Sequence, residues 1–284
     1  MEVMPQVLTP DGMRFIAPDG APLSSLAAIN QLDSTEQEQI YRTLLIGELL
    51  ERFSVDQKTL CNPLGERVVT FDTSPNIGLV ELRIWRQLAD RDPVLYMQLA
   101  DTTNNQLIVL LFVTNDPDSP RFQVDRDWGG EPTKFGTLSR NLEAEVAALQ
   151  AGLAPGQVRR GLRMARKTLP AFETFVSRLG HEMFLLEPLA YHSAVLFETF
   201  GCAYSQGRPR MEHIHQAFQP PDGELYLRLD GSTPFRMPGA EQTVLGRSWA
   251  IHDGILGEPF TDYHMYKHVG KDADVRTFPN YRWV

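Results

Sequence analysis

Residues 94–113 read VLYMQLADTTNNQLIVLLFV, and this stretch decides the fold. Two apolar runs, residues 94–99 and 107–113, enclose Asp101–Asn105, a polar cluster of residues that favour turns. The pattern predicts a β-hairpin. Its second strand carries apolar side chains on both faces, so we expect residues 107–113 to lie in the centre of a sheet.

Further strands are expected on either side of this hairpin. Residues 68–71 are short and β-branched, and residues 80–85 alternate between apolar and polar side chains, as a half-buried antiparallel strand does. Later in the chain, short strands at 183–186 and 202–205 enclose a helix at 191–200. This alternation predicts a βαβ-like arrangement that closes onto the sheet.

Three other segments have the apolar spacing of helices. The first has a capping box at Ser34 and Gln37, followed by a helical stripe that ends at Phe53. The second spans 138–149. The third spans 158–179, where Pro170 must kink or split the helix and Gly180 should end it.

Together these patterns predict an α+β protein with a mainly antiparallel central sheet flanked by helices. Residues 1–65 form a helical N-terminal segment, and residues 66–206 form the central core. Residues 207–284 are rich in His, aromatic residues, Pro and Gly, and we expect an irregular C-terminal extension there.

Composition excludes several classes of protein. The 284 residues are 42% hydrophobic and 10% aromatic, enough to bury a core. A net charge of −9 repels phosphate backbones and anionic lipid, so we expect no nucleic-acid partner. No apolar run approaches the roughly 20 residues that span a bilayer, and residues 1–10 lack a signal-peptide pattern. We therefore expect a soluble protein of the cytoplasm with no membrane partner.

The two cysteines, Cys61 and Cys202, are far apart and have no CxxC spacing. Neither a disulfide framework nor a thiolate zinc ribbon is expected. A serine hydrolase is not expected either, because Ser248 lies in Gly246-Arg247-Ser248-Trp249-Ala250, which lacks the second glycine of a nucleophile elbow.

The helix expected at 191–200 carries Ala194 and Phe197 and is followed by Gly201. This spacing resembles the Ala, Tyr and Gly of the last helix in the GNAT acyltransferase superfamily, and the resemblance extends over residues 156–204. In that family a central strand leads to a loop that holds the coenzyme A pyrophosphate at a helix N-terminus, and a strand and a helix follow. The resemblance implies a GNAT-like fold and an acyl-coenzyme A ligand.

The chain departs from the family at chemically important positions. Its loop, residues 157–163, reads QVRRGLR and lacks the run of glycines that lets backbone amides approach the pyrophosphate. Phe197 stands where the family usually has the tyrosine that protonates the departing thiolate. Tyr191 stands in place of its asparagine, and Cys202 in place of its phenylalanine. We therefore expect altered catalytic positions, with the catalytic residues unknown.

Basic residues cluster near the start of the third helix. Arg159, Arg160 and Arg163 are the candidate cofactor-binding residues, since guanidinium groups near a helix N-terminus attract a phosphorylated ligand such as coenzyme A. The same charges would equally suit a solvated helix face.

All seven histidines lie between residues 181 and 268. His213 and His215 would share a face if residues 213–215 form a strand, because side-chain direction repeats every second residue. With His252 and His264 they are candidate ligands for a divalent metal such as Zn, Fe or Mn. The alternative is that these histidines are half-buried hydrogen-bonding residues. His181 and His192 are expected to be a helix-capping residue and a polar surface residue.

Three functions remain open from the sequence. The first is a GNAT-like acyl-coenzyme A-binding or acyltransferase-related protein, and the second is a metal-dependent enzyme that uses the C-terminal histidines. The third is a non-catalytic interaction protein that uses the aromatic residues of segment 247–284. Such aromatic residues line small-molecule pockets, partner surfaces or ordinary cores. The sequence leaves the substrate, the reaction and the oligomeric state undecided.

Overall fold

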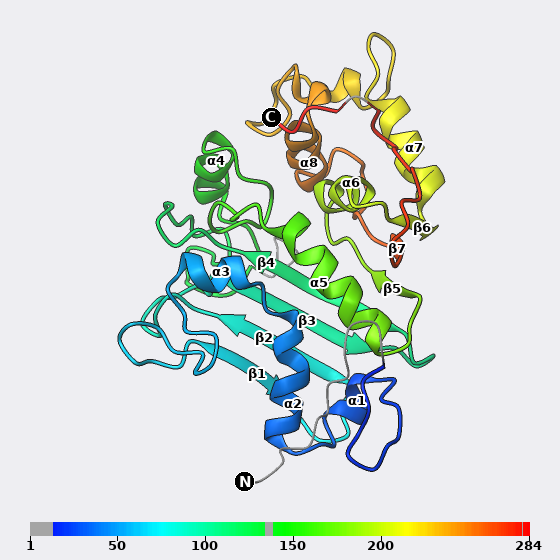
Figure 1. The fold of residues 1–284 in the computed structure, drawn as a ribbon. Coiled ribbons are helices and arrows are strands. Elements are labelled where there is room, and N and C mark those ends of the chain that lie inside the picture. The colour runs from blue at the N-terminus through cyan, green and yellow to red at the C-terminus, as the bar shows by residue number, and fades with distance from the viewer. Residues whose placement is uncertain (1–13, 134–138, 280) are drawn as a thin grey trace. The chain divides into compact units, whose positions relative to one another are not determined.

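The computed structural model describes residues 14–133, 139–279 and 281–284, which form two compact units (Figure 1). The first unit comprises the described parts of 1–117, 161–186 and 267–271, and the second comprises 118–160, 187–266 and 272–284. Each unit therefore brings together segments that are distant in sequence. Residue 138, the start of the helix predicted at 138–149, lies outside the described residues.

The first unit contains a mixed sheet with strand order β1-β2-β3-β4-β5. Its strands are β1 (Val69–Thr73), β2 (Leu79–Ile84), β3 (Leu95–Asp101), β4 (Leu107–Thr114) and β5 (Met183–Leu186). The first four are antiparallel to one another, and β5 is parallel to β4. The predicted hairpin and the central position of residues 107–113 are confirmed, and the chain is α+β.

The helices of the first unit are α1 (Leu26–Ile29), α2 (Ser34–Tyr41), the 3-10 turn η1 (Arg42–Leu44), α3 (Gly47–Arg52) and α5 (Ala165–Arg178). The single helix expected from Ser34 to Phe53 is wrong, because Leu45 and Ile46 have extended backbone between η1 and α3. The N-cap is Asp33, whose carboxylate accepts from the N–H groups of Thr35 and Glu36. A carboxylate both accepts these bonds and neutralises the positive pole of the helix.

Helix α5 begins later than its apolar stripe suggested, so Val158 and Leu162 lie outside it. Pro170 lies inside the helix. Gly180 has a φ of +82° and follows the C-cap, and the His181 N–H closes the end by donating to the Val176 carbonyl (3.1 Å). Gly180 therefore ends α5 as expected, since the left-handed backbone of a Schellman motif favours glycine.

Buried polar side chains tie α1 and α2 to the sheet. The Asp101 carboxylate, at the end of β3, accepts from the N–H groups of Leu26 and Ala27 (2.9 and 2.8 Å) and so caps α1. Asn30 is only 1% exposed; its Nδ2 donates to the carbonyls of Ile77 and Leu79, and its Oδ1 accepts from the Tyr41 hydroxyl (2.6 Å). Asn30 thus joins α2, through the Tyr41 hydroxyl, to the start of β2, through the two carbonyls.

The second unit contains four α-helices within its described residues: α4 (Leu142–Gln150), α6 (Tyr191–Thr199), α7 (Arg208–Ala217) and α8 (Val244–His252). It also has the 3-10 turns η2 (Tyr226–Arg228) and η3 (Ala240–Gln242). Strand β6 (Ala203–Gln206) pairs antiparallel with β7 (His264–His268), which begins in this unit and ends in the first. Helices α6 and α8 pack against each other (Figure 1). The strand, helix and strand predicted at 183–205 are confirmed as β5, α6 and β6.

The core of the second unit is built around Trp249, which has no exposed surface. Its indole Nε1 donates to the Leu153 carbonyl (2.8 Å), and the Phe235 ring stacks on it at 5.1 Å. Tyr263 and Phe278 are also buried. These three aromatic residues of the C-terminal segment therefore belong to the core. In the described ranges, no helix is long and apolar enough to cross a bilayer.

Replacing Asn30 with alanine should lower the free energy of unfolding by about 2–4 kcal/mol, because the Tyr41 hydroxyl and two carbonyls lose their buried partner. Tyr41→Phe should cost about 1 kcal/mol. Urea denaturation measures both values. The control is Thr35→Ala, at an exposed position of α2, which should stay within about 0.5 kcal/mol of the wild type. Equal stability of Asn30→Ala and the control would show that this contact does not tie the helices to the sheet.

Candidate functional site

Strand β4 is paired unequally on its two sides. It pairs with β3 from Leu107 to Thr114, but with β5 at only two positions, Ile108 with Leu185 and Val109 with Leu186. Within the described residues the parallel ladder stops there, while β4 continues for five more residues. Main-chain groups along this part of the edge are not used by β5, and unpaired strand edges readily accept another extended chain.

The same part of β4 is incompletely covered. Leu107 is buried, but every residue from Ile108 to Thr114 is half-exposed although most are apolar. In the neighbouring strand β3, by contrast, Leu95, Met97 and Leu99 are at most 2% exposed. A central strand with half-exposed apolar side chains offers a surface that gains free energy when a ligand covers it.

The loop before α5 lies at the end of β4. The Leu162 N–H donates to the Thr114 hydroxyl (3.1 Å). A Cβ at Gly161 would lie 3.4 Å from the Thr114 carbonyl oxygen, so the two backbones approach closely. The C-terminal end of β4 and the N-terminus of α5 are therefore held together by the loop at 161–164.

The N-terminus of α5 is positively charged. Its N-cap is Met164, whose side chain makes no capping hydrogen bond, and Arg166 and Lys167 lie in the first turn. The Lys167 ammonium pairs with the Glu48 carboxylate of α3. Cations are unfavourable at this end of a helix, and an anion there is stabilised by both the charges and the N–H groups.

The three arginines proposed for cofactor binding have different surroundings. Arg163 belongs to the first unit, is exposed and has a left-handed φ of +58°, immediately before α5. Arg159 and Arg160 belong to the second unit. There the Arg159 guanidinium donates to the Ser119 carbonyl, and the Arg160 N–H donates to the Ser119 hydroxyl (3.2 Å).

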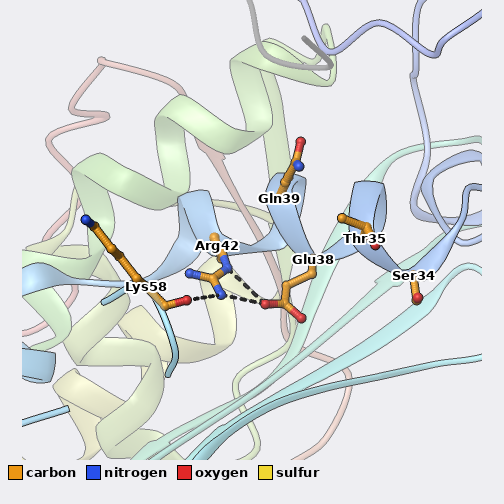
Figure 2. A pocket seen from close by; sticks show the side chains of 6 residues that line it. All are labelled: Ser34, Thr35, Glu38, Gln39, Arg42 and Lys58. Carbon is orange, nitrogen blue, oxygen red and sulfur yellow. Dashed lines mark hydrogen bonds and ion pairs between the residues drawn. The ribbon is translucent and has the colours of Figure 1, made fainter. Parts of the chain in front are cut away.

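A separate depression of about 550 Å³ lies beside α2 and is lined by Ser34, Thr35, Glu38, Gln39, Arg42 and Lys58 (Figure 2). The Arg42 guanidinium donates to Glu38 and to the carbonyl oxygens of Gln57 and Lys58. Burial alone would raise the pKa of Glu38, but hydrogen bonds from Arg42 and Arg67 lower it overall. These contacts stabilise the junction of α2 with residues 57–58.

The prediction that residues 213–215 form a strand is wrong, because they lie in α7. Positions two apart in a helix point to roughly opposite sides, so His213 and His215 do not share a face. His213 is exposed and lies 3.4 Å from the Glu224 carboxylate. His215 accepts from the Arg247 guanidinium through Nδ1 (3.1 Å), and burial followed by this positive charge lowers its pKa.

The other two proposed metal ligands are also in separate surroundings. His252, at the end of α8, contacts the buried Glu145 carboxylate (3.2 Å), which also pairs with Arg140. His264 is exposed at the start of β7. In the part of the chain that the structure describes, no group of three or more His, Cys, Asp or Glu side chains is arranged to hold a metal ion.

His192 is not the surface residue expected from the sequence. It is half-buried in α6, and its Nδ1 lies 2.8 Å from the hydroxyl of Ser248, which is 2% exposed in α8. Burial, with a smaller contribution from His252, lowers the pKa of His192 to about 4. The imidazole is thus neutral at pH 7 and joins the two helices through one hydrogen bond.

The sequence reasoning missed Glu198, which is 1% exposed near the end of α6. Its carboxyl oxygens accept from the Tyr204 hydroxyl (2.7 Å) and from both the N–H and the hydroxyl of Thr277 (2.9 and 2.6 Å). Burial raises the pKa of Glu198, while these donors favour its ionised form. A signal was present, because Glu198 follows Val195 by three residues on the buried side of the helix.

The fold explains why a glycine is required at position 201. Its φ is +77°, and a Cβ there would lie 2.8 Å from the Asp272 Cα. The Gly201 carbonyl accepts from the Ala273 N–H (3.2 Å). The glycine that carries part of the family spacing therefore also lets segment 272–277 approach the end of α6.

Comparison with known proteins supplies no further identification: no family model matches the chain, and no curated protein or solved structure matches it.

The low pKa of His192 predicts a loss of stability in mild acid. Because its folded pKa (about 4) lies below the ordinary value of 6.5, its contribution is complete above pH 6.5 and is lost as the pH falls toward 4. The loss should be at most about 3 kcal/mol. Urea denaturation across this range should show a shallower pH dependence for His192→Asn. The exposed-site control His213→Asn should keep the wild-type slope, and identical slopes for all three proteins would contradict the assignment.

Gly201→Ala should destabilise the protein more than Gly152→Ala. Both positions have positive φ, which costs an alanine about 1–2 kcal/mol, but a Cβ at Gly152 meets nothing within 4 Å. The backbone contact at Gly201 should add about 1–3 kcal/mol. Thermal unfolding of the two variants measures the difference. Equal melting temperatures would mean that segment 272–277 does not press on Gly201.

Proposed function

We propose that the first unit binds an acyl-coenzyme A-type ligand along β4 and at the N-terminus of α5. The observation that carries this proposal is the early end of the β4 and β5 ladder, which lies beside half-buried apolar residues of β4 and a positively charged helix start. This arrangement combines an apolar surface, main-chain groups that do not pair with β5, and a helix start that would attract an anion.

Each part of the ligand has a complementary part of this site. The diphosphate would be held by the N–H groups of the first turn of α5 and by Arg163. The extended, amide-containing arm would run along the open edge of β4, where it exchanges hydrogen bonds with the strand. The acyl group would cover apolar side chains of β4.

The order of elements supports the same proposal. In the resembled GNAT superfamily a central strand, a ligand-binding loop, a helix, a strand and a helix followed by glycine succeed one another. Here the corresponding elements are β4, the loop at 161–164, α5, β5 and α6 followed by Gly201. A segment of the second unit, residues 118–160, which contains α4, separates β4 from residue 161 in sequence.

The proposed activity excludes ordinary acetyl transfer, in which a tyrosine protonates the departing thiolate. Phe197, at the position of the family's proton-donating tyrosine, has no hydroxyl and is half-buried. A departing thiolate would not be protonated from this position. We therefore propose a ligand-binding or acyltransferase-related role with altered catalytic positions.

Isothermal calorimetry with coenzyme A tests the proposal. The wild type should bind, and Arg163→Ala should bind about tenfold more weakly, because one charge-assisted contact to the diphosphate is lost. Lys58→Ala is the control, since it removes the same charge from the same unit beside α2. Affinity of the wild type and of the control should fall with added salt.

The outcome that would contradict the proposal is the absence of heat and of a melting-temperature shift with millimolar coenzyme A. Equal weakening by Arg163→Ala and Lys58→Ala would also contradict it, because the ligand would then respond to the overall charge of the protein.

A further inference from the structure

Arg247 is a buried cation in the second unit, independent of the ligand site proposed above. It lies in α8 and is 2% exposed. Its Nε donates to the Glu241 carbonyl (2.7 Å), and its Nη1 lies 3.1 Å from Nδ1 of His215. Both partners are uncharged groups, because the first is a backbone carbonyl and the second is a histidine with a lowered pKa.

No carboxylate pairs with this guanidinium among the described residues. The charge of the Glu241 side chain acts on Arg247, but the two oxygens of this carboxylate accept from the Gly239 N–H (2.9 Å) and the Gln242 amide (3.2 Å). The carboxylate of Glu198, in α6, already accepts hydrogen bonds from Tyr204 and Thr277. Burial accordingly lowers the pKa of Arg247. A buried charge is normally paired, because its removal from water is costly.

Aromatic rings cover the guanidinium. The Phe278 ring centre lies 3.7 Å from the guanidinium carbon, and the Phe218 ring centre lies at 5.1 Å. Cation–π contacts of this kind stabilise a desolvated arginine, although less than a directly bonded anion does. The rings also exclude water, so the surroundings of Arg247 suit a ligand with an apolar body.

Two buried tyrosine hydroxyls provide an independent indication of a ligand. Tyr191 and Tyr263 are each 1% exposed, and within the described part of the chain neither hydroxyl makes a hydrogen bond of normal geometry. The Tyr191 hydroxyl lies close enough to Arg247 for the guanidinium to oppose the rise in its pKa that burial causes. Phe260 stacks on the Tyr263 ring at 3.9 Å and meets the Tyr191 ring edge-on at 6.3 Å. Buried hydroxyls without partners are rare in native proteins, and a bound acceptor would satisfy them.

We propose that Arg247, Tyr191 and Tyr263 form a binding site for a small monocarboxylate with an apolar body. The carboxylate supplies the missing negative charge to Arg247 and accepts hydrogen bonds from the tyrosine hydroxyls, while Phe218, Phe278 and Phe260 surround the apolar part. A phosphate dianion fits less well, because the single buried cation would leave one negative charge uncompensated.

Entry to this site requires movement of the segment that carries Phe278, because this ring covers Arg247. The neighbouring Thr277 is held to α6 through Glu198, so the segment is anchored beside the site. Binding is therefore measured at equilibrium, after long incubation of the whole protein with the ligand.

Benzoate is the probe, and inorganic phosphate at the same ionic strength is the comparison. We expect benzoate to raise the melting temperature and to bind measurably by calorimetry, and phosphate to do neither. Tyr191→Phe should weaken benzoate binding about tenfold or more while changing the ligand-free melting temperature little, because the hydroxyl that it removes makes no hydrogen bond of normal geometry in the free protein.

Tyr204→Phe is the matched control, because its hydroxyl is already bonded to Glu198. It should lower the ligand-free melting temperature and leave benzoate affinity unchanged. Arg247→Gln should abolish benzoate binding, and Tyr191→Phe keeps the proposal testable if that variant does not fold. No binding of benzoate, equal or tighter binding of phosphate, or unchanged benzoate affinity in Tyr191→Phe would each overturn the proposal. None of these results depends on whether coenzyme A binds to the first unit.

Discussion

The parallel pairing of β4 with β5 ends after two residue pairs, and the ligand site proposed for the first unit depends on this constraint. A fully paired central strand would have no free main-chain groups and would be covered along its length. The ladder stops at Val109 and Leu186, and β4 has a half-buried apolar surface up to Thr114, where the loop before α5 contacts it. The strand end and the helix start thus place an apolar region next to a positively charged one.

In the second unit, hydrogen bonds between buried polar groups join segments that are distant in sequence. An apolar core alone would fix the positions of these segments less specifically. Glu198 on α6 accepts three hydrogen bonds from Tyr204 and Thr277, and His192 joins α6 to Ser248 on α8. Each of these groups is satisfied, as buried polar groups normally are. Arg247 and Tyr191 differ from them because their charge and hydroxyl lack a full set of partners, which is why we assign a ligand to them and not to the others.

The sequence predicts local structure well where the apolar period is unambiguous. The alternation at 80–85, the apolar run at 107–113 and the Gly180 stop are all found close to their expected positions. It fails where tertiary contacts override the period. The stripe from Ile40 to Phe53 is interrupted at Leu45, and His213 and His215 lie in a helix that begins after a left-handed Gly207. The candidate site could be predicted only in part. The charge of Arg163 makes it a candidate from the sequence alone. The open edge of β4 depends on how far β5 pairs with it, and the sequence of β4 does not predict this length.

Hydrogen exchange with and without coenzyme A gives the most direct test of the open strand edge. If the ligand lies along β4, amides within 110–114 and 162–167 should become protected on binding, while those of β1 and β2 should exchange as before. Binding that leaves the exchange of 110–114 unchanged, or that protects a different part of the first unit, would show that the early end of the β4 and β5 ladder does not form the ligand site.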